Sequence, residues 1–335
     1  MIISSAPQKL IGSAFTAVLA LVSMATTASG STDKPGDGVK ITPIFSSIAE
    51  ERFRGEIAME GLRQLGYKVQ EPKETEYSVM MVALANGDAD FSVHLWERLH
   101  DSFYRQAGGD RDMLKGGVVM PDVKQGYQID KKTADAYHIQ SITDLQRPEI
   151  AKLFDSDGDG KADLTGCNPG WGCELIIDHH MKSYALSSTV HVNQGSYFAL
   201  MADTLARYND GKPVLFFTWV PQWLSSVLVA DKDVVWLDLP PAENQAADDK
   251  SNHPEDKIES VLNREFAQRN PAALKFLSEM QISAADESAQ NFKMHEGERK
   301  EKDITRHAME WISAHQDEFN KWLNDSRAAA SVSSL

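Results

Sequence analysis

The sequence predicts an α/β fold of two lobes with a ligand cleft between them. Strand and helix signals alternate from Val39 onward, the alternation resumes after residue 117, and the chain is long enough for two domains. A β-α-β-α-β order favours a parallel sheet with helices on both faces. Ligands of such sheets bind beyond the carboxyl ends of the strands. Residues that directly follow predicted strands are therefore the first candidates for function.

The N-terminus predicts an export signal over residues 1–28. Lys9 supplies positive charge, residues 10–25 carry none, and small residues allow cleavage after Ala28 or Gly30. The alternative is a membrane anchor, but the apolar run is too short to span a bilayer comfortably. No cysteine lies near the junction and no later segment is long and apolar enough to span, so we expect a soluble, exported chain without a lipid anchor.

The first predicted lobe alternates three strands with two helices. Ser47 and Glu50 have capping-box spacing before the first helix, and Gly66 and Gly87 follow the two helices as C-terminal glycines. The strands are expected at 39–44, 67–69 and 89–94, and the second helix at 75–86.

The second predicted lobe repeats this pattern. Strands are expected at 118–120, 126–129, 189–192, 214–218 and 234–239, and helices at 133–137, 149–154, 174–186 and 197–208. An acidic stretch from Pro240 to residue 256 indicates a mobile surface loop. An amphipathic helix is expected over 303–323, and the tail 328–335 has no core-forming pattern, which predicts disorder.

Charge and cysteine content exclude some partners. The formal net charge of −15 argues against binding to nucleic acid or to anionic membranes. Cys167 and Cys173 lie close together in an exported chain, where a disulfide is more common than two free thiols. A loop this short is stabilised by only about 2 kcal/mol, so a bridge would shape a local turn.

Three tryptophans lie where a cleft is expected, at strand ends or in a tight turn. These are Trp96, Trp171 and Trp219. By contrast, Trp236 inside a predicted strand and Trp311 and Trp322 on the last helix fit the core. A desolvated tryptophan face attracts a cation by up to about 2 kcal/mol. Because a quaternary ammonium cannot donate a conventional hydrogen bond, several such faces suit it better than a carboxylate does.

A carboxylate site is predicted beside these rings. Gly172 and Cys173 lead into a predicted helix, and the free N–H groups at a helix start bind anions. His100, four residues after Trp96, could donate a further hydrogen bond, the alternative being a surface histidine on a helix.

Several segments resemble a known family. The run 155–174, DSDGDGKADLTGCNPGWGCE, is similar to the glycine betaine/proline betaine-binding proteins of ProU-type osmoprotectant importers, as are segments 125–127, 129–135 and 201–204. The resemblance covers about 39–239 and resumes near 270–273. The Cys-Asn-Pro-Gly-Trp-Gly-Cys stretch is long and unusual, which makes the match specific.

This resemblance implies the fold and the site. The fold would be that of a type II-like periplasmic binding protein, with lobe 1 formed by 36–126 and 245–326 and lobe 2 by 127–244. The box of three rings, Trp96, Trp171 and Trp219, would hold the trimethylammonium group. His100 and the backbone N–H groups of Gly172 and Cys173 would hold the carboxylate, and Cys167 and Cys173 would form a disulfide.

The resemblance also implies the function. The chain would be a monomer in the periplasm that binds glycine betaine or proline betaine and delivers it to an inner-membrane ABC permease with its ATPase. No cofactor, metal or nucleic acid is expected. The ranking among glycine betaine, proline betaine, carnitine and choline stays open.

The alternative function is an enzyme of choline or betaine metabolism that uses the same rings. Such an enzyme needs a nucleophile, metal or cofactor motif, and the sequence has no G-x-S-x-G, P-loop or G-x-G-x-x-G. The run Asp178-His179-His180 suggests acid/base or metal chemistry, but adjacent helical residues do not face one another. We therefore do not expect catalysis.

Two further segments each leave open more than one interpretation of their structure. Asp155, Asp157, Asp159, Gly160 and Asp163 match much of a calcium loop, but Gly166 occupies the twelfth position, where the bidentate glutamate belongs. An Asx-rich turn is the preferred interpretation. Between Pro240 and Glu265 the chain departs from the family, and its segment 257–262 is short and polar for a return strand to the first lobe.

Overall fold

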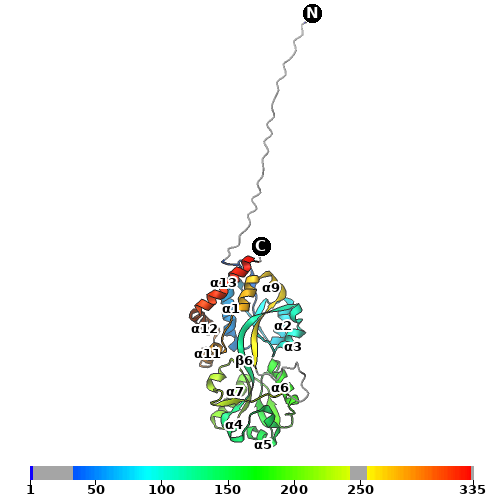
Figure 1. Ribbon diagram of the computed structural model, residues 1–335, viewed down its shortest axis with the longest axis vertical. Helices are drawn as coiled ribbons and strands as arrows, with labels where there is room; N and C mark the ends of the chain where they lie inside the picture. The colour runs from blue at the N-terminus through cyan, green and yellow to red at the C-terminus, as the bar shows by residue number, and fades with distance from the viewer. Residues whose placement is uncertain (3–32, 242–254, 333–335) are drawn as a thin grey trace.

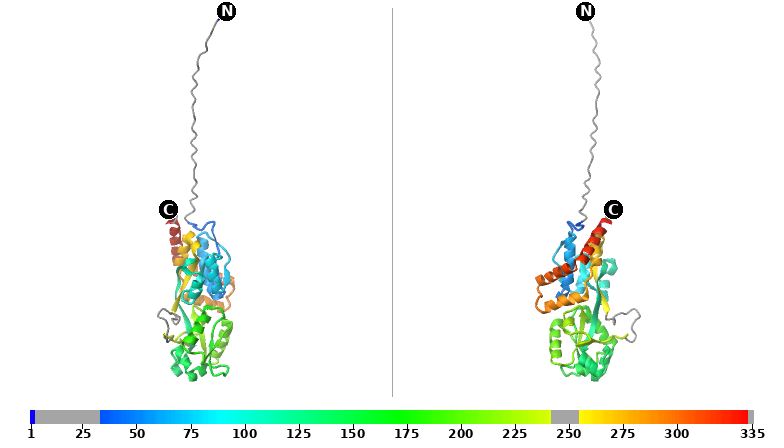
Figure 2. Two further views of the ribbon diagram at one scale, coloured as in Figure 1. Left: turned by 90° about the vertical axis from the view of Figure 1, so that its right-hand side faces the viewer. Right: turned by 60° about the vertical axis from the view of Figure 1, so that its left-hand side comes forward.

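The computed structural model describes residues 1–2, 33–241 and 255–332. Residues 33–241 and 255–332 form two lobes along the long axis of the molecule (Figure 1). Figure 2 shows the same division from two other sides. The predicted export signal, apart from its first two residues, lies outside the described residues, as do residues 242–254 of the predicted loop. Within the described ranges, no helix has the length and apolarity needed to cross a membrane.

The first lobe opens with short strands paired in parallel, as predicted. The pairs are β1 (Lys40–Ile41) with β3 (Lys68–Val69), and β2 (Ile44–Ser46) with β4 (Lys73–Thr75). The 3-10 turn η1 (Ala49–Glu51) leads into α1 (Arg52–Gln64), and α2 (Tyr77–Asn86) follows β4.

The predicted ends of these two helices are confirmed, but one predicted start is wrong. Gly66 and Gly87 follow α1 and α2 with φ of 93° and 75°, a backbone that favours glycine. The capping box at Ser47 and Glu50 does not form. Instead, Ser47 Oγ donates to Glu76 Oε1 over 2.8 Å, because β4 and the start of α2 pack beside this turn.

The main sheet carries strands from both lobes and is mixed rather than parallel throughout. Its order is β5 (Phe91–Trp96), β11 (Glu255–Asn263), β6 (Met113–Asp130), β9 (Leu215–Val220), β7 (Ala162–Thr165) and β8 (Val190–Asn193), with β10 (Val234–Trp236) also on β6. The pairs among β7, β8 and β9 are parallel, whereas β11 and β6 run antiparallel to their neighbours. The long strand β6, predicted as two short strands, continues from one lobe into the other (Figure 1).

The polar segment 257–262 does form the return strand to the first lobe. It belongs to β11, which lies between β5 and β6 and is mostly buried. The carboxylate of Glu259 pairs with Lys257 at 2.7 Å and Lys115 at 3.3 Å. Ser260 Oγ donates to the carbonyl of Leu277 at 2.6 Å. Paired in this way, polar side chains are tolerated in a central strand.

Helices cover the sheet in both lobes (Figure 1). In chain order they are α3 (Asp101–Gln106), η2 (Gly109–Arg111), α4 (Lys131–Tyr137), η3 (Ile142–Gln146), α5 (Pro148–Ala151), η4 (Lys152–Phe154), α6 (Gly172–Ser183), α7 (Tyr197–Asn209), α8 (Leu224–Val227), α9 (Arg264–Arg269), α10 (Pro271–Glu279), α11 (Ala284–His295), α12 (Glu301–Ala314) and α13 (Gln316–Val332).

Two predictions for the C-terminal region are wrong. The single helix expected over 303–323 is divided at His315 into α12 and α13. The tail expected to be disordered is helical to Val332, since α13 packs on α10. The last residues, 333–335, lie outside the described ones.

The three tryptophans predicted to lie in the core differ in how deeply they are buried. Trp311 and Trp322 are buried, as predicted. Trp236 is only half buried, because β10 pairs with β6 alone and Lys124 Nζ lies over its ring, 4.7 Å from the centroid.

Candidate functional site

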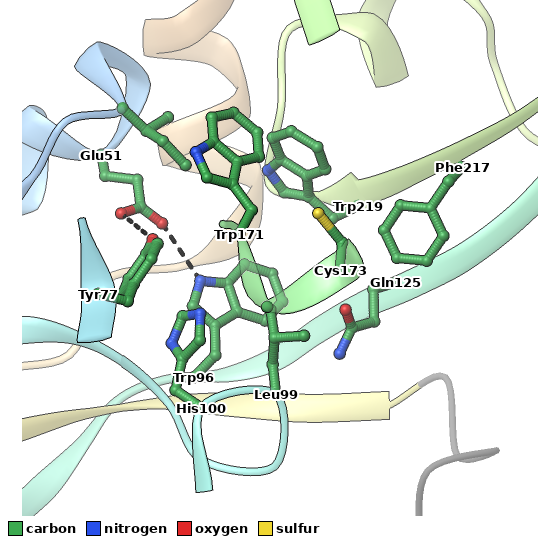
Figure 3. A pocket seen from close by; sticks show the side chains of 12 residues that line it. Glu51, Tyr77, Trp96, Leu99, His100, Gln125, Trp171, Cys173, Phe217 and Trp219 are labelled. Atoms are coloured by element: carbon green, nitrogen blue, oxygen red, sulfur yellow. Dashed lines mark hydrogen bonds between the residues drawn. The ribbon is translucent and has the colours of Figure 1, made fainter. Parts of the chain in front are cut away.

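One pocket brings together all six residues predicted to bind a ligand (Figure 3). They are Trp96, His100, Trp171, Gly172, Cys173 and Trp219. The remaining lining residues are Ile48, Glu51, Tyr77, Leu99, Gln125 and Phe217. Trp96 ends β5 of the first lobe, whereas Trp171 precedes α6 and Trp219 lies in β9 of the second. The pocket therefore lies where the two lobes meet.

The second lobe contributes a group of aromatic rings that pack on one another. The ring centroids of Trp171 and Trp219 lie 6.0 Å apart with planes at 75°. Tyr197 packs 4.7 Å from Trp219, and its hydroxyl accepts a hydrogen bond from Gln222 Nε2 at 3.1 Å. Because each ring is held by its neighbours, these faces are presented to the pocket in a fixed arrangement.

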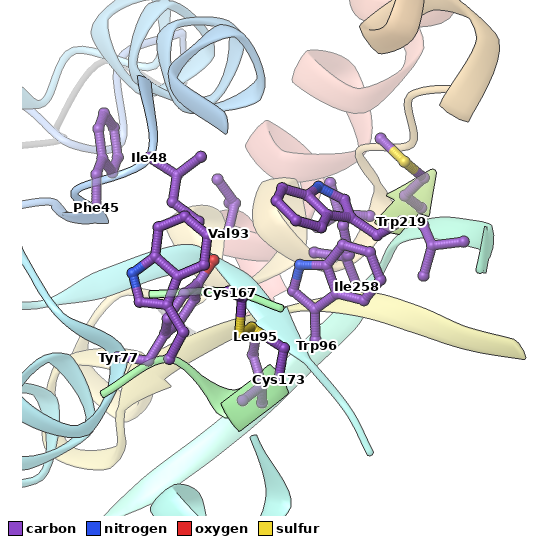
Figure 4. Packing of buried hydrophobic residues seen from close by; sticks show 14 of the residues in the cluster. Phe45, Ile48, Tyr77, Val93, Leu95, Trp96, Cys167, Cys173, Trp219 and Ile258 are labelled. Carbon is purple, nitrogen blue, oxygen red and sulfur yellow. A yellow bond between two sulfur atoms is a disulfide. The ribbon is translucent and has the colours of Figure 1, made fainter. Parts of the chain in front are cut away.

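The first lobe holds its tryptophan through a buried carboxylate. Trp96 Nε1 donates to Glu51 Oε1 over 3.2 Å, and Tyr77 Oη donates to Glu51 Oε2 over 2.5 Å (Figure 3). Figure 4 shows Trp96 among buried apolar side chains that include Leu95 and Ile258. Trp96 is 3% exposed, so its indole N–H requires a protein acceptor, and Glu51 supplies one.

The His100 side chain is buried beside this network. Its ring stacks on Tyr77 at 3.7 Å, and among the described residues neither ring nitrogen has a protein partner. Burial lowers the pKa of His100 to about 3, so the imidazole is neutral and carries one N–H. A buried donor left unpaired costs about 1–3 kcal/mol, which a ligand acceptor would recover.

The start of α6 lies directly against His100. Helix starts leave backbone N–H groups without an intrahelical acceptor, and no side chain caps α6. A Cβ on Gly172 would come within 2.9 Å of Leu99 Cγ and 3.0 Å of His100 Cδ2. Glycine therefore allows the backbone of the second lobe to approach the first lobe at this point.

The predicted disulfide is present. Cys167 and Cys173 are bonded, with Cα atoms 6.4 Å apart, and the bridge lies in the buried cluster beside the pocket (Figure 4). It ties the loop that carries Trp171 to the first turn of α6. The bridge thus connects the ring-bearing turn to the predicted carboxylate site.

Sequence reasoning missed several residues around the pocket. Glu51 and Tyr77 lie far from Trp96 in the chain, and no local pattern indicates that they contact it. Tyr197 starts α7 and supports Trp219 from behind. Trp223 was also not considered; it does not line the pocket, and its ring stacks on His295 at 4.0 Å.

The other acidic and histidine segments lie outside this pocket. Among the residues that the structure describes, Asp155, Asp157 and Asp159 form a group of carboxylates within 4.8 Å of one another. Asp155 accepts hydrogen bonds from the backbone N–H groups of Gly158 and Gly160, as expected for an Asx-rich turn. His180 is buried, and its Nδ1 lies 3.0 Å from Tyr127 Oη.

Two α/β lobes that enclose a pocket of aromatic rings define the chain as a periplasmic binding protein. A family profile described as "Substrate binding domain of ABC-type glycine betaine transport system" matches residues 39–314. The chain belongs to this family. It is the substrate-binding protein of such a transporter and not an enzyme, which removes the alternative of choline or betaine metabolism.

Individual relatives agree with this assignment. The chain is 48% identical over 308 residues to the glycine betaine-binding periplasmic protein OusX of Dickeya dadantii (strain 3937), covering 89% of this chain and 93% of that protein. It is 46% identical over 323 residues to the glycine betaine/proline betaine-binding periplasmic protein of Escherichia coli (strain K12), covering 94% and 97%. The crystal structure of lactococcal OpuAC, closed and complexed with glycine betaine, superposes with a TM-score of 0.67 at 19% identity, covering 85% and 99%. This last similarity establishes the fold.

Proposed function

We propose that this chain captures glycine betaine or proline betaine in the periplasm and delivers it, as a monomer, to an inner-membrane ABC permease and its ATPase. One observation carries the proposal. A single buried pocket combines three tryptophan rings with a neutral histidine and an uncapped helix start. The rings match a quaternary ammonium at one end of a ligand, and the hydrogen-bond donors of the histidine and the helix start match a carboxylate at the other end.

The rings of Trp96, Trp171 and Trp219 form the ammonium site. Two of these rings are held at 75° to each other, so they offer two differently directed faces to one methylated group. The rings are 3–9% exposed, and desolvation strengthens the attraction between a cation and a ring. Each ring contributes up to about 2 kcal/mol in such surroundings.

The start of α6 and His100 form the carboxylate site. The N–H groups of Gly172 and Cys173 point out of the first turn, and the helix dipole favours an anion there. His100, neutral and without a partner among the described residues, adds one donor. Charge-assisted hydrogen bonds of this kind contribute roughly 1.5–3 kcal/mol each.

Closure of the lobes assembles these parts. In the proposed division, the described residues of 36–126 and 245–326 form lobe 1, and those of 127–244 form lobe 2. Trp96 and His100 then belong to lobe 1, and Trp171, Gly172, Cys173 and Trp219 to lobe 2. Because each end of the ligand contacts both lobes, binding and closure are coupled. The summed contributions exceed the roughly −8 kcal/mol of micromolar affinity, and the surplus covers ordering and closure.

Calorimetric titration of the purified protein with glycine betaine, proline betaine, carnitine and choline tests the proposal. The betaines are expected to bind with micromolar or tighter affinity, and choline more weakly because it lacks the carboxylate. Equal affinity for choline and glycine betaine would contradict the carboxylate site. Absence of binding for both betaines would overturn the proposed function.

A further inference from the structure

A buried carboxylate that lines the pocket, Glu51, accepts hydrogen bonds from two other lining residues, Trp96 and Tyr77. The side chain of Glu51 is 5% exposed and both of its oxygens have partners. Oε1 accepts from Trp96 Nε1 at 3.2 Å and pairs with Arg54 Nη2 at 2.7 Å. Oε2 accepts from Tyr77 Oη at 2.5 Å and from Ser46 Oγ.

These contacts reach both ends of the proposed ligand site. Through Trp96, Glu51 fixes the plane of one ring of the ammonium site. Through Tyr77 it fixes the ring on which His100 stacks at 3.7 Å, and His100 belongs to the carboxylate site. Since neither ring nitrogen of His100 has a hydrogen-bond partner among the described residues, that stacking is a main constraint on the orientation of the ring.

Glu51 is kept as an anion despite its burial. Burial alone would raise the pKa of Glu51, but the Arg54 guanidinium, His94 and the hydrogen bonds from Ser46 and Tyr77 outweigh it, and the pKa falls to about 2. A carboxylate has no proton to donate, so it can only accept from Trp96 and Tyr77. This fixes the direction of both hydrogen bonds.

Arg54 also pairs with a second buried carboxylate, Glu287, which can be compared with Glu51. Glu287 of α11 forms an ion pair with Arg54 Nη1 and is 1% exposed. Burial raises the pKa of Glu287 to about 8. Glu51 and Glu287 thus share burial and partner, but of the two only Glu51 lines the pocket and contacts Trp96 and Tyr77.

We propose that Glu51 is a positioning residue of the binding site, which orients Trp96 directly and His100 through Tyr77. This inference rests on the proposed function and deepens it. Glu51 acts through other residues, since its oxygens are occupied by protein donors. Its removal therefore affects the ammonium end and the carboxylate end of the ligand together.

Calorimetric titration with glycine betaine at pH 9, where Glu51 and Glu287 are both ionised, tests the inference in Glu51→Ala, Glu51→Gln and Glu287→Ala. Both alanine variants take one carboxylate from Arg54 and lose stability for the same reason. Glu51→Ala is expected to weaken binding by about tenfold or more, and Glu287→Ala by less than about twofold. Glu51→Gln keeps one oxygen acceptor but replaces the other with an amide N–H₂ donor, so it should lose less affinity than Glu51→Ala but still bind several-fold more weakly than the wild type. Equal losses of affinity in the two alanine variants would show that Glu51 has only a structural role.

A double-mutant cycle with Trp96→Phe adds a test that global stability does not affect. Phenylalanine keeps a ring but has no N–H for Glu51 to orient. Glu51→Gln should therefore cost clearly less affinity in the Trp96→Phe background than in the wild type. Full additivity would contradict the inference, as would wild-type affinity in folded Glu51→Gln and Tyr77→Phe. If Glu51→Ala does not fold, this cycle and Tyr77→Phe decide the question.

The outcome for Glu51 is separable from that for the proposed function. If the wild-type protein binds neither betaine, the proposed function fails. If the wild type binds glycine betaine and the folded Glu51 variants bind it equally well, only the positioning role fails.

Discussion

Five of the six buried tryptophans fall into two groups, one in the pocket and one in the C-terminal helices. Trp96, Trp171 and Trp219 are 3%, 7% and 9% exposed, and Trp311 and Trp322 are 8% and 3% exposed. Burial alone therefore does not separate the two groups. Their surroundings do.

The helical tryptophans are packed on aromatic neighbours from their own region. Trp311 and Trp322 stack at 6.2 Å with planes at 19°, and His315 covers Trp311 at 4.1 Å. The pocket tryptophans come from three separate segments of the chain and line a common pocket. A buried ring contributes to the core where protein atoms cover its faces, and to binding where a face remains for a ligand.

The largest expected effect separates these two groups. Replacing Trp96, Trp171 or Trp219 by Ala should weaken glycine betaine binding by about tenfold or more in each case, because each removes a face of the proposed ammonium site. Trp311→Ala should instead cost about 3–5 kcal/mol of stability and leave affinity unchanged in the folded protein. Titration and thermal unfolding of the four variants check this. Unchanged affinity in two of the three pocket variants, shown to be folded, would rule out the box.

A second prediction concerns His100 and the carboxylate end. His100→Ala should weaken glycine betaine binding by about tenfold, the equivalent of one hydrogen bond to a charged group. Choline binding should change much less, because choline has no carboxylate for His100 to contact. The readout is the ratio of the two affinities. A similar loss for both ligands would place His100 in the packing of the pocket rather than in contact with the carboxylate.

A smaller effect is expected from two histidines that each stack on a tryptophan. His295 covers Trp223 at 4.0 Å across the lobes, and His315 covers Trp311 at 4.1 Å within the C-terminal helices. Such a pair contributes about 0.5–1.5 kcal/mol. His295→Ala should therefore lower glycine betaine affinity several-fold, because in the proposed lobe division this contact joins the two lobes, whereas His315→Ala should lower only the melting temperature. Affinity losses of equal size would remove the distinction between the two stacks.

The smallest expected effect is that of calcium. The loop at Asp155, Asp157 and Asp159 has glycine where a calcium loop needs its bidentate glutamate, and backbone N–H groups already bind Asp155. Adding calcium to chelator-treated protein should change neither the melting temperature nor betaine affinity. A clear upward shift in melting temperature would show that this loop holds a cation.

Local patterns predicted much of the fold, but not the long strand β6. The sequence predicted two short strands at 118–120 and 126–129, whereas β6 runs continuously from Met113 to Asp130. In the structure a Cβ on Gly117 would come within 1.9 Å of the carbonyl oxygen of Ser278, so glycine allows α10 to approach a continuous strand. A glycine required by a distant helix cannot be told from a turn glycine in a single sequence.

Some pocket residues could be predicted from local sequence segments, whereas others join the pocket only through contacts between distant segments. Trp96, Trp171 and Trp219 stand at strand ends or in a tight turn, and their segments resemble a known family. Glu51 lies 45 residues before Trp96, and their contact depends on how η1 packs against β5. Periodicity identifies elements, but it does not reveal which polar side chain will meet a buried indole.

The most direct test is a crystal structure of the protein grown with glycine betaine. The trimethylammonium group is expected within about 6 Å of the ring centroids of Trp96, Trp171 and Trp219. The carboxylate should accept hydrogen bonds from His100 and from the backbone N–H groups of Gly172 and Cys173. A ligand bound outside this pocket, or one whose carboxylate faces the tryptophan rings, would contradict the account.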